Sequence, residues 1–475
     1  MTGGATASAD PRRWLVLAIC CSSLFIVGMD VSIVNVALPA IRMDFGADIS
    51  GLQWTIDAYT LVLASLLVLS GSLGDRFGRR RTFQTGLTLF SIGSLLCSLA
   101  PSLEWLVVFR IVQAVGGSML NPVALSIISN TFLDAKERAR ALGVWSAVAG
   151  LSLSLGPVIG GALVDSIGWR AIFWINVPIG IAAIVFSGLF VPESRGGAAR
   201  RIDPLGQLIA IVLLSSLVFG IIELPDVATE AVLVPVMFAI AAASLVAFIV
   251  VERRVRDPLI DMRFFRSASF SGATIIAVLA FASLAGFLFL NTLYLQNVRG
   301  YTPLLAGLAT LPMAAMNAAA APLSGRIVAA RGARIPLVLA GCCTAAGATL
   351  LAVTFTATTP LAVLLTAYVL LGLGLGMVNP PIANAAVSGM PRSRSGVAAA
   401  VASTGRQTGS SLGVAVIGAI VAVGTAQTAA FVSAGRAAWV LIACLGVVIL
   451  IVGIVSTTRW AARTTASVSD LVADR

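Results

Sequence analysis

Three charged side chains interrupt apolar segments in the first part of the chain. Asp30 lies in MDVSIVNVALP, Asp57 in QWTIDAYTL and Arg110 in RIVQAVGG. A charged residue inside a membrane-spanning helix is costly, so each is by default a candidate for function. A buried carboxylate can bind and release a proton, and a nearby arginine opposes its protonation. We therefore expect proton-coupling chemistry from these residues. The alternatives are that Asp30 is only hydrogen-bonded in place and that Asp57 is an interfacial acid at a helix start.

A second concentration of charge lies in GSLGDRFGRRR, which runs from Gly71 to Arg81. Its glycines permit a tight turn, and its aspartate and arginines can interact with helix ends. We expect a latch that holds two helix bundles together on the cytoplasmic side in one state and releases them in another. A simple positively charged tether is the alternative. The candidate latch residues are Gly71, Asp75, Arg76, Gly78, Arg79 and Arg80.

Glycine and proline recur at short spacing in SLSLGPVIGG. Glycines let helices approach closely, and a proline inside a helix removes a backbone hydrogen bond and bends the helix. The order of Gly156, Pro157, Gly160 and Gly161 favours a specialised helix over generic helix packing, which remains the alternative.

The segments that must position these residues are long and apolar. Of 475 residues, 58% are hydrophobic and 11% are charged, with a mean hydropathy of +1.00, which is typical of polytopic membrane proteins. The runs are too long and too uniformly apolar for barrel strands, so the predicted fold class is an all-α membrane protein. We expect about fourteen spanning helices of roughly 20 or more residues, near residues 14–40, 51–73, 83–100, 104–128, 141–163, 171–191, 204–223, 231–250, 270–293, 303–325, 335–355, 359–381, 396–424 and 437–457.

The formal net charge of +11 is explained by membrane topology. If the N-terminus is cytoplasmic, most lysines and arginines fall in cytoplasmic loops, as the positive-inside rule requires. We therefore expect a multi-pass protein of the bacterial cytoplasmic membrane, with both termini in the cytoplasm. Nucleic acid is not an expected partner.

Two polar breaks divide the chain, ESRGGAARRIDP and ERRVRDPLIDMRFFRS. We expect an N-terminal six-helix bundle over residues 1–195 and a two-helix insert with flanking cytoplasmic loops over 196–266. A C-terminal six-helix bundle and a cytoplasmic tail occupy 267–475. The stretch SGRIVAARGAR, Ser324–Arg334, echoes the candidate latch in the second half without its acid. Repeats of this kind are typical of transporters.

Several kinds of chemistry find no support in the sequence. There is no histidine, which removes the commonest metal ligand and general base, and no Gly-x4-Gly-Lys-Ser/Thr loop for ATP. We expect no metal, no cofactor and no enzymatic activity. A membrane-embedded enzyme or receptor is the remote alternative. The six cysteines are interpreted as small buried apolar residues.

Together with GWRAIFWINVPIG, these motifs resemble the fourteen-helix drug:proton antiporter branch of the major facilitator superfamily, of the EmrB/QacA type. The resemblance covers almost the whole chain and is strongest over residues 28–195. It implies the major facilitator fold, with two six-helix bundles plus two extra helices. It also implies a latch role for the GxLxDRxGRR loop, an antiporter motif at Gly156–Gly161, proton coupling through Arg110, and a role for Asp30 as a coupling or substrate acid. The last six predicted helices contain no acidic residue, which argues against export of dications.

The expected function is proton-coupled export of amphipathic drugs or toxic compounds. The expected partners are a small amphipathic substrate, protons and the lipid bilayer, and the expected state is a monomer. A dedicated exporter of an endogenous antibiotic, lipid or metabolite on the same fold is the alternative. Such a protein needs a broad apolar cavity with few polar groups, and the candidate lining residues are Phe25, Met29, Trp54, Tyr59, Phe287, Asn291 and Asn379.

Overall fold

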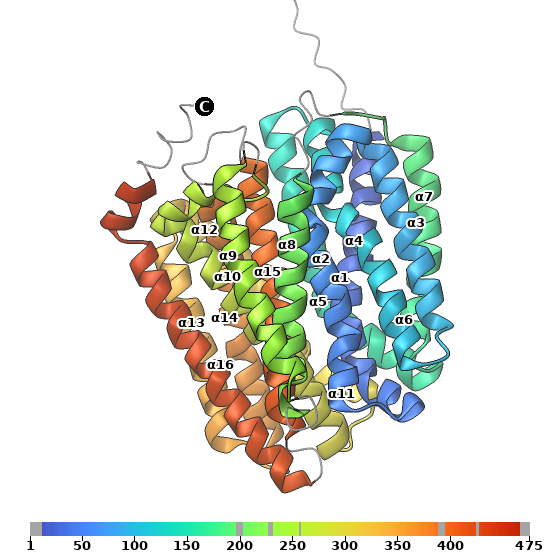
Figure 1. The fold of residues 1–475 in the computed structure, drawn as a ribbon, viewed down its shortest axis with the longest axis vertical. Coiled ribbons are helices and arrows are strands. Elements are labelled where there is room, and N and C mark those ends of the chain that lie inside the picture. Colours follow the sequence, from blue (N-terminus) through green and yellow to red (C-terminus); the bar gives the residue numbers. More distant parts are fainter. Residues whose placement is uncertain are drawn as a thin grey trace, which may run out of the picture.

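The protein is a bundle of long, roughly parallel helices in the computed structural model (Figure 1). The structure describes residues 12–195, 203–226, 231–255, 258–387, 395–423 and 427–465, and within these ranges it contains no strand. The expected all-α class is therefore confirmed for the part of the chain that is described. Twelve of its helices are long and apolar enough to cross a membrane.

The helices fall into a first group, an intervening pair and a second group. The first group comprises α1 Arg12–Phe45, α2 Ile49–Phe77, α3 Arg79–Ser98, α4 Leu103–Thr131, α5 Ala135–Ser166, α6 Ala171–Trp174 and α7 Asn176–Phe190. The pair is α8 Pro204–Ile222 and α9 Leu233–Arg254. The second group comprises α10 Ala268–Leu293, α11 Pro303–Ala309, α12 Leu311–Arg331, α13 Arg334–Thr354, α14 Leu361–Val387, α15 Ser395–Ala422 and α16 Thr428–Ser456.

Each of the fourteen predicted apolar segments is helical, but fourteen spans are not confirmed. Helices α3 and α15 run alongside their neighbours (Figure 1) yet are absent from the twelve candidate spans, because polar side chains dilute their apolar character. Two segments predicted as single helices are also interrupted. The 171–191 segment breaks at Ile175 between α6 and α7, and the 303–325 segment breaks at Thr310 between α11 and α12.

Local signals at the chain turns explain several helix ends. The Asp48 carboxylate accepts a hydrogen bond from Gly51 N (2.7 Å) at the start of α2, and Asp203 does the same for Gly206 N (2.8 Å) at the start of α8. These side chains satisfy amide groups that a helix start leaves without partners. Helix α2 ends at Gly78, whose φ of +109° is open mainly to glycine.

Hydrogen bonds join the two groups at one end of the bundle. We call the end that contains the α1–α2 connection and the start of α11 the distal end, and the opposite end the proximal end. Gln53 on α2 donates to Ala415 O on α15 (2.8 Å), Leu304 N on α11 donates to Asp165 on α5 (3.0 Å), and Gln296 donates to Val36 O (2.9 Å). The structure is therefore closed at its distal end.

The intervening pair packs onto the seam between the groups. Helix α8 contacts both α2 and α15, and α9 packs against α8. Glu223, just after α8, accepts hydrogen bonds from Ser50 Oγ (2.8 Å) and Trp54 Nε1 (3.0 Å). This contact fixes the distal end of α8 to the start of α2.

The expectation that all six cysteines are buried is wrong for part of the set. Cys20, Cys21 and Cys97 are buried in the first group, whereas Cys342 and Cys444 are exposed on the second group. In a membrane-spanning helix, an apolar exposed surface faces lipid, so an apolar sequence context does not by itself predict burial inside the protein.

Candidate functional site

Asp30 lies at the centre of the first group. It is on α1 and is fully buried, with 0% of its surface exposed. The glycine-lined face of α5 packs beside it: a Cβ atom on Gly156 would collide with the hydroxyl of Ser32, and one on Gly160 would lie 2.5 Å from Ile33 Cγ1. Small residues on α5 thus allow α1 to run deep inside the group, which removes Asp30 from solvent.

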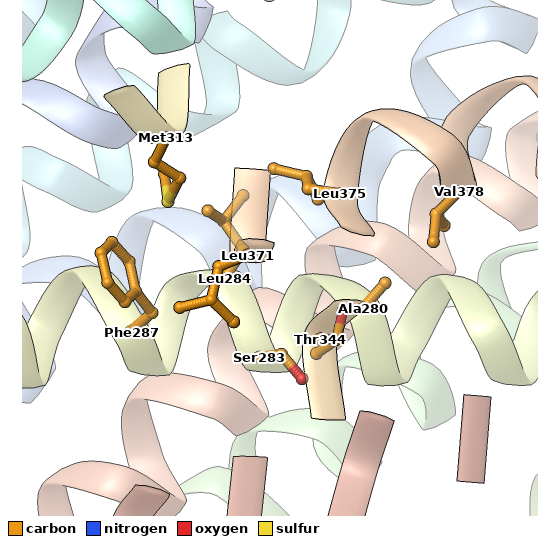
Figure 2. A pocket seen from close by; sticks show the side chains of 9 residues that line it. All are labelled: Ala280, Ser283, Leu284, Phe287, Met313, Thr344, Leu371, Leu375 and Val378. Carbon is orange, nitrogen blue, oxygen red and sulfur yellow. The ribbon is translucent and has the colours of Figure 1, made fainter. Parts of the chain in front are cut away.

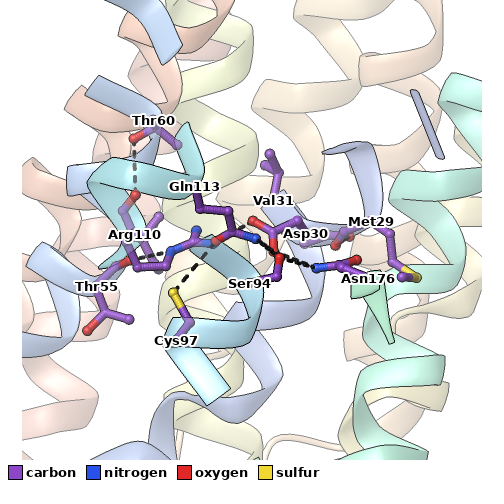
Figure 3. A network of polar contacts seen from close by, with 12 residues as sticks. Met29, Asp30, Val31, Thr55, Thr60, Ser94, Cys97, Arg110, Gln113 and Asn176 are labelled. Atoms are coloured by element: carbon purple, nitrogen blue, oxygen red, sulfur yellow. Dashed lines mark hydrogen bonds and ion pairs between the residues drawn. The ribbon is translucent and has the colours of Figure 1, made fainter. Parts of the chain in front are cut away.

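Arg110 on α4 pairs directly with this carboxylate (Figure 3). Its Nη1 lies 2.5 Å from Asp30 Oδ2, and its Nε donates to Thr55 O on α2 (3.1 Å). The guanidinium carbon also sits 4.1 Å from the centre of the Tyr59 ring, a cation–π arrangement. The structure therefore brings together two of the three charged residues singled out in the sequence.

Uncharged polar side chains complete a network around Asp30 (Figure 3). Gln113 Nε2 donates to Asp30 Oδ1 (2.8 Å) and to Ser94 Oγ (2.7 Å), while its Oε1 accepts from Arg110 Nη1 (2.7 Å). Asn176, the first residue of α7, donates to Asp30 Oδ1 (3.2 Å). The sequence analysis did not identify Ser94, Gln113 or Asn176. The available signals were the position of Gln113 three residues after Arg110, on one helix face, and the place of Asn176 within GWRAIFWINVPIG.

The network balances one negative and one positive charge in a buried site. Burying such a pair is costly unless further hydrogen bonds satisfy both groups, and removing one partner typically costs about 3–5 kcal/mol. Neutralising Asp30 with a proton would release Arg110 from its only carboxylate contact in the described structure. Protonation of Asp30 can therefore change the position of Arg110.

Asp57 lies outside this network. It is also 0% exposed and lies within α2. Its Oδ1 accepts a weak hydrogen bond from Thr60 (3.3 Å), and its Oδ2 has no donor within hydrogen-bonding geometry. The hydroxyl of Ser411 on α15 lies nearby. Asp57 thus occupies the seam between the two groups.

Gly161 and Pro157 of the predicted antiporter motif join α5 to the second group. A Cβ atom on Gly161 would lie 2.5 Å from Pro303 O and 2.7 Å from Leu304 Cα on α11. Conversely, a Cβ atom on Gly307 would collide with the carbonyl oxygen of Pro157. The motif therefore contacts α1 through Gly156 and Gly160, and α11 through Pro157 and Gly161.

In the part of the chain that the structure describes, the candidate latch residues contact the first group and the segment that follows it. Asp75 pairs with Arg79 (2.8 Å). Arg80 N donates to Glu193 Oε1 (3.1 Å), just after α7, and a Cβ atom on Gly78 would lie 2.7 Å from that carboxylate. Gly71 faces Pro122 on α4, and Arg76 lies over the ring of Phe77. Among the described residues, none of these contacts reaches α10–α16.

The predicted substrate-cavity residues do not line one common space. Phe287 borders a cavity of about 20 Å³ in the second group (Figure 2), which has room for about one water molecule. Met29 is buried in the core and Tyr59 lies against Arg110. Trp54 donates to Glu223, and Asn291 accepts from Tyr368. Phe25 and Asn379 are half-buried on α1 and α14.

A neighbouring cavity of similar size lies where the groups meet. It is lined from α5 by Ser154 and Pro157, and from the second group by Leu284, Met313 and other residues. Leu284 and Met313 line both cavities, but the sequence analysis did not identify either. An ordinary apolar residue in an apolar helix carries no sequence signal of its orientation.

Comparison with known sequences identifies a family and named relatives. The family model for the Major Facilitator Superfamily matches residues 20–414. The chain is 38% identical to the multidrug resistance protein Stp of Mycobacterium tuberculosis (strain CDC 1551 / Oshkosh), over 84% of this chain and 74% of that protein. It is 37% identical to the tetracenomycin C resistance and export protein of Streptomyces glaucescens (86% and 76% covered). It is 34% identical to the methylenomycin A resistance protein of Streptomyces coelicolor (88% and 89% covered).

Solved structures share the fold at low sequence identity. A POT family transporter in complex with 5-aminolevulinic acid superposes with a TM-score of 0.69 at 16% identity, covering 96% of this chain and 98% of that one. A D-xylose-proton symporter gives 0.68 at 14% identity, with 92% and 96% covered. At these identities the likeness concerns the fold alone.

Proposed function

The chain belongs to the major facilitator superfamily, and on that premise we propose that it is a proton-coupled antiporter that exports amphipathic drugs or toxic compounds across the bacterial cytoplasmic membrane. The observation that carries the proposal is the buried Asp30–Arg110 pair with its hydrogen-bond network. The names of the relatives, which refer to multidrug resistance and to antibiotic resistance and export, support the substrate class.

The distribution of basic residues supports the orientation. Arg80, Arg81, Arg253 and Arg254 lie at the proximal end, which we therefore place in the cytoplasm, together with both termini. The distal end is then external, and the protein is closed on its external side. The proposed domains are the two six-helix bundles, 1–195 and 267–475, and the insert, 196–266. The proposed functional unit is a monomer.

A transport cycle follows from this geometry. With the external side closed, substrate enters from the cytoplasm while Asp30 is ionised and paired with Arg110. The bundles then rock so that the contacts between α5 and α11 separate and the external side opens. An external proton neutralises Asp30, Arg110 is released, and substrate leaves. The empty carrier returns and the proton passes to the cytoplasm. Asp57, at the seam, is the second candidate proton site.

A second candidate function is export of one dedicated compound made by the producing cell. The observation that favours it is that two of the relatives are named for resistance to a single antibiotic each. Efflux assays with a panel of amphipathic dyes separate the two functions, since a dedicated exporter would move none of the panel.

The test uses purified protein in proteoliposomes with an imposed pH gradient and ethidium as the probe. We expect gradient-driven ethidium movement by the wild type and its loss in Asp30→Asn. Asp44→Asn is the matched control, because Asp44 lies at the end of the same helix, half-exposed and paired with Arg170 (2.7 Å). Transport that survives Asp30→Asn unchanged would show that Asp30 is not the coupling acid.

A further inference from the structure

Asn176 carries an unused hydrogen-bond acceptor inside the Asp30 network. Its side chain is 0% exposed, and its Nδ2 donates to Asp30 Oδ1 (3.2 Å) and Ser94 Oγ (3.3 Å). Its Oδ1 is buried and has no donor. Other buried amide oxygens in the described structure also lack a donor, among them Gln53 Oε1 and Asn317 Oδ1, but Asn176 Oδ1 is the one whose own amide group contacts Asp30. An acceptor beside an ionised carboxylate has nothing to accept, but it gains a donor if the carboxylate is protonated.

The other side chains that are hydrogen-bonded within the Asp30 network are already committed. Gln113 Oε1 accepts from Arg110 Nη1 (2.7 Å), so its amide cannot rotate without losing that bond. Ser94 Oγ accepts two hydrogen bonds, from Gln113 and Asn176, which occupy both lone pairs of a hydroxyl. Arg110 can only donate. Asn176 is therefore the member of the network with an acceptor to spare.

We propose that Asn176 Oδ1 accepts a hydrogen bond from the protonated carboxyl group of Asp30 and so sets the proton affinity of that group. The inference rests on the proposed function, in which Asp30 carries the proton. In the ionised state, the amide nitrogen donates to the carboxylate, as observed. When Asp30 Oδ1 takes up a proton, a half-turn of the amide about its Cβ–Cγ bond brings the carbonyl oxygen to that proton. The Asp30 hydroxyl then donates to Asn176 Oδ1.

The surroundings of Asp30 contain no competing charge in the described structure. Arg110 from α4 is the charged group that faces it. Tyr59 from α2 and Cys97 from α3 are the titratable neutral groups nearby, and α7 contributes Asn176 alone to the contacts. A change in the protonation of Asp30 therefore alters the contacts of two residues. Arg110 favours the ionised form and Asn176 accommodates the neutral form.

The experiment is an infrared pH titration of the purified full-length protein, which requires no substrate. The carboxylic acid band of Asp30 is identified as the band that Asp30→Asn removes. We expect Asn176→Leu to move the midpoint of this band to lower pH, by up to about one unit, because the protonated acid loses its acceptor while the ionised form keeps its shorter bonds from Arg110 and Gln113. Gln113→Leu should move the midpoint to higher pH, since it removes a donor to the ionised form.

The opposite signs of these two shifts make the inference decidable. An unchanged midpoint in Asn176→Leu, or a shift in the same direction as Gln113→Leu, would overturn it. Asn176→Ser, which retains a small acceptor, should give a smaller downward shift and serves if the leucine variant does not fold. If Asp30→Asn removes no titrating band, the proposed role of Asp30 fails and the inference falls with it. That result differs from a normal Asp30 band with an unmoved midpoint.

Discussion

Replacing Gly161 by alanine should open the distal side of the protein. The added Cβ atom would lie 2.5 Å from Pro303 O and 2.7 Å from Leu304 Cα, and neither backbone atom can move away without displacing α11. Normal contacts are about 3.5–4.0 Å, so α5 and α11 must separate by roughly 1 Å. Overpacking of this kind typically costs about 1–3 kcal/mol.

Only the state in which α5 touches α11 bears this cost. The population of the distal-closed state relative to the open state should therefore fall by roughly 5- to 150-fold. The matched control is Gly143→Ala on the same helix, where no atom lies within 4 Å of the added Cβ.

Spin-label distances across the distal opening provide the assay. Labels at Met43 on α1 and Val353 on α13, which are 86% and 75% exposed, report the separation of the two groups. Native cysteines must first be replaced, because Cys342 and Cys444 are exposed. We expect a longer-distance population in Gly161→Ala and an unchanged distribution in Gly143→Ala. Identical distributions in both variants would refute the reasoning.

Three further predictions concern buried or partly buried polar groups. Arg110→Ala should lower the free energy of unfolding by about 3–5 kcal/mol, because it leaves Asp30 without its counter-ion. Thermal melting would show this loss, and the double variant with Asp30→Asn should recover part of it. Glu223→Gln should weaken the docking of α8 by about 1–2 kcal/mol, since the charge-assisted bond to the Trp54 indole is lost. The fluorescence spectrum of Trp54 should change as well, and an unaltered spectrum would count against that contact. Arg406→Gln, on α15, should increase the free energy of unfolding by about 1 kcal/mol, because this half-buried arginine has no ion-pair partner among the described residues. A lower melting temperature would contradict this.

The charged part of the site could be predicted from the sequence because charge in an apolar helix is conspicuous. Asp30 and Arg110 each interrupt a long apolar run, and the cost of isolated charge in a membrane favours pairing. The fold-level prediction succeeded for the same reason, since long apolar segments have few structural solutions in lipid.

The neutral part of the site could not be predicted in this way. Neutral polar side chains such as Ser94, Gln113 and Asn176 cost little free energy in many environments. Their presence in a helix therefore carries little information about which side chains they contact. Their contacts depend on how α3, α4 and α7 pack around α1, which is a tertiary property. The break at Ile175 that starts α7 at Asn176 was also missed, because the surrounding segment reads as one continuous apolar helix.

The contrast between Asp57 and Asp30 shows a further limit. Both are acids near the start of the chain, yet Asp30 is enclosed by one helix group and Asp57 faces α15, more than half of the chain away. Sequence position alone does not separate an acid inside a bundle from one at a seam.

Helix α8 is attached to the two groups in different ways, and this has a mechanical consequence. Polar bonds tie it to α2: Gln207 donates to Ser65 O, and Glu223 accepts from Ser50 and Trp54. Its contact with α15 is an aliphatic patch that includes Val218, Ile222 and Ala415. Polar bonds fix a register, whereas aliphatic surfaces can slide without losing a directional partner. When the two groups move relative to each other, the α8–α9 pair should remain attached to the first group and slide across the second. The pair would then cover the seam throughout the motion.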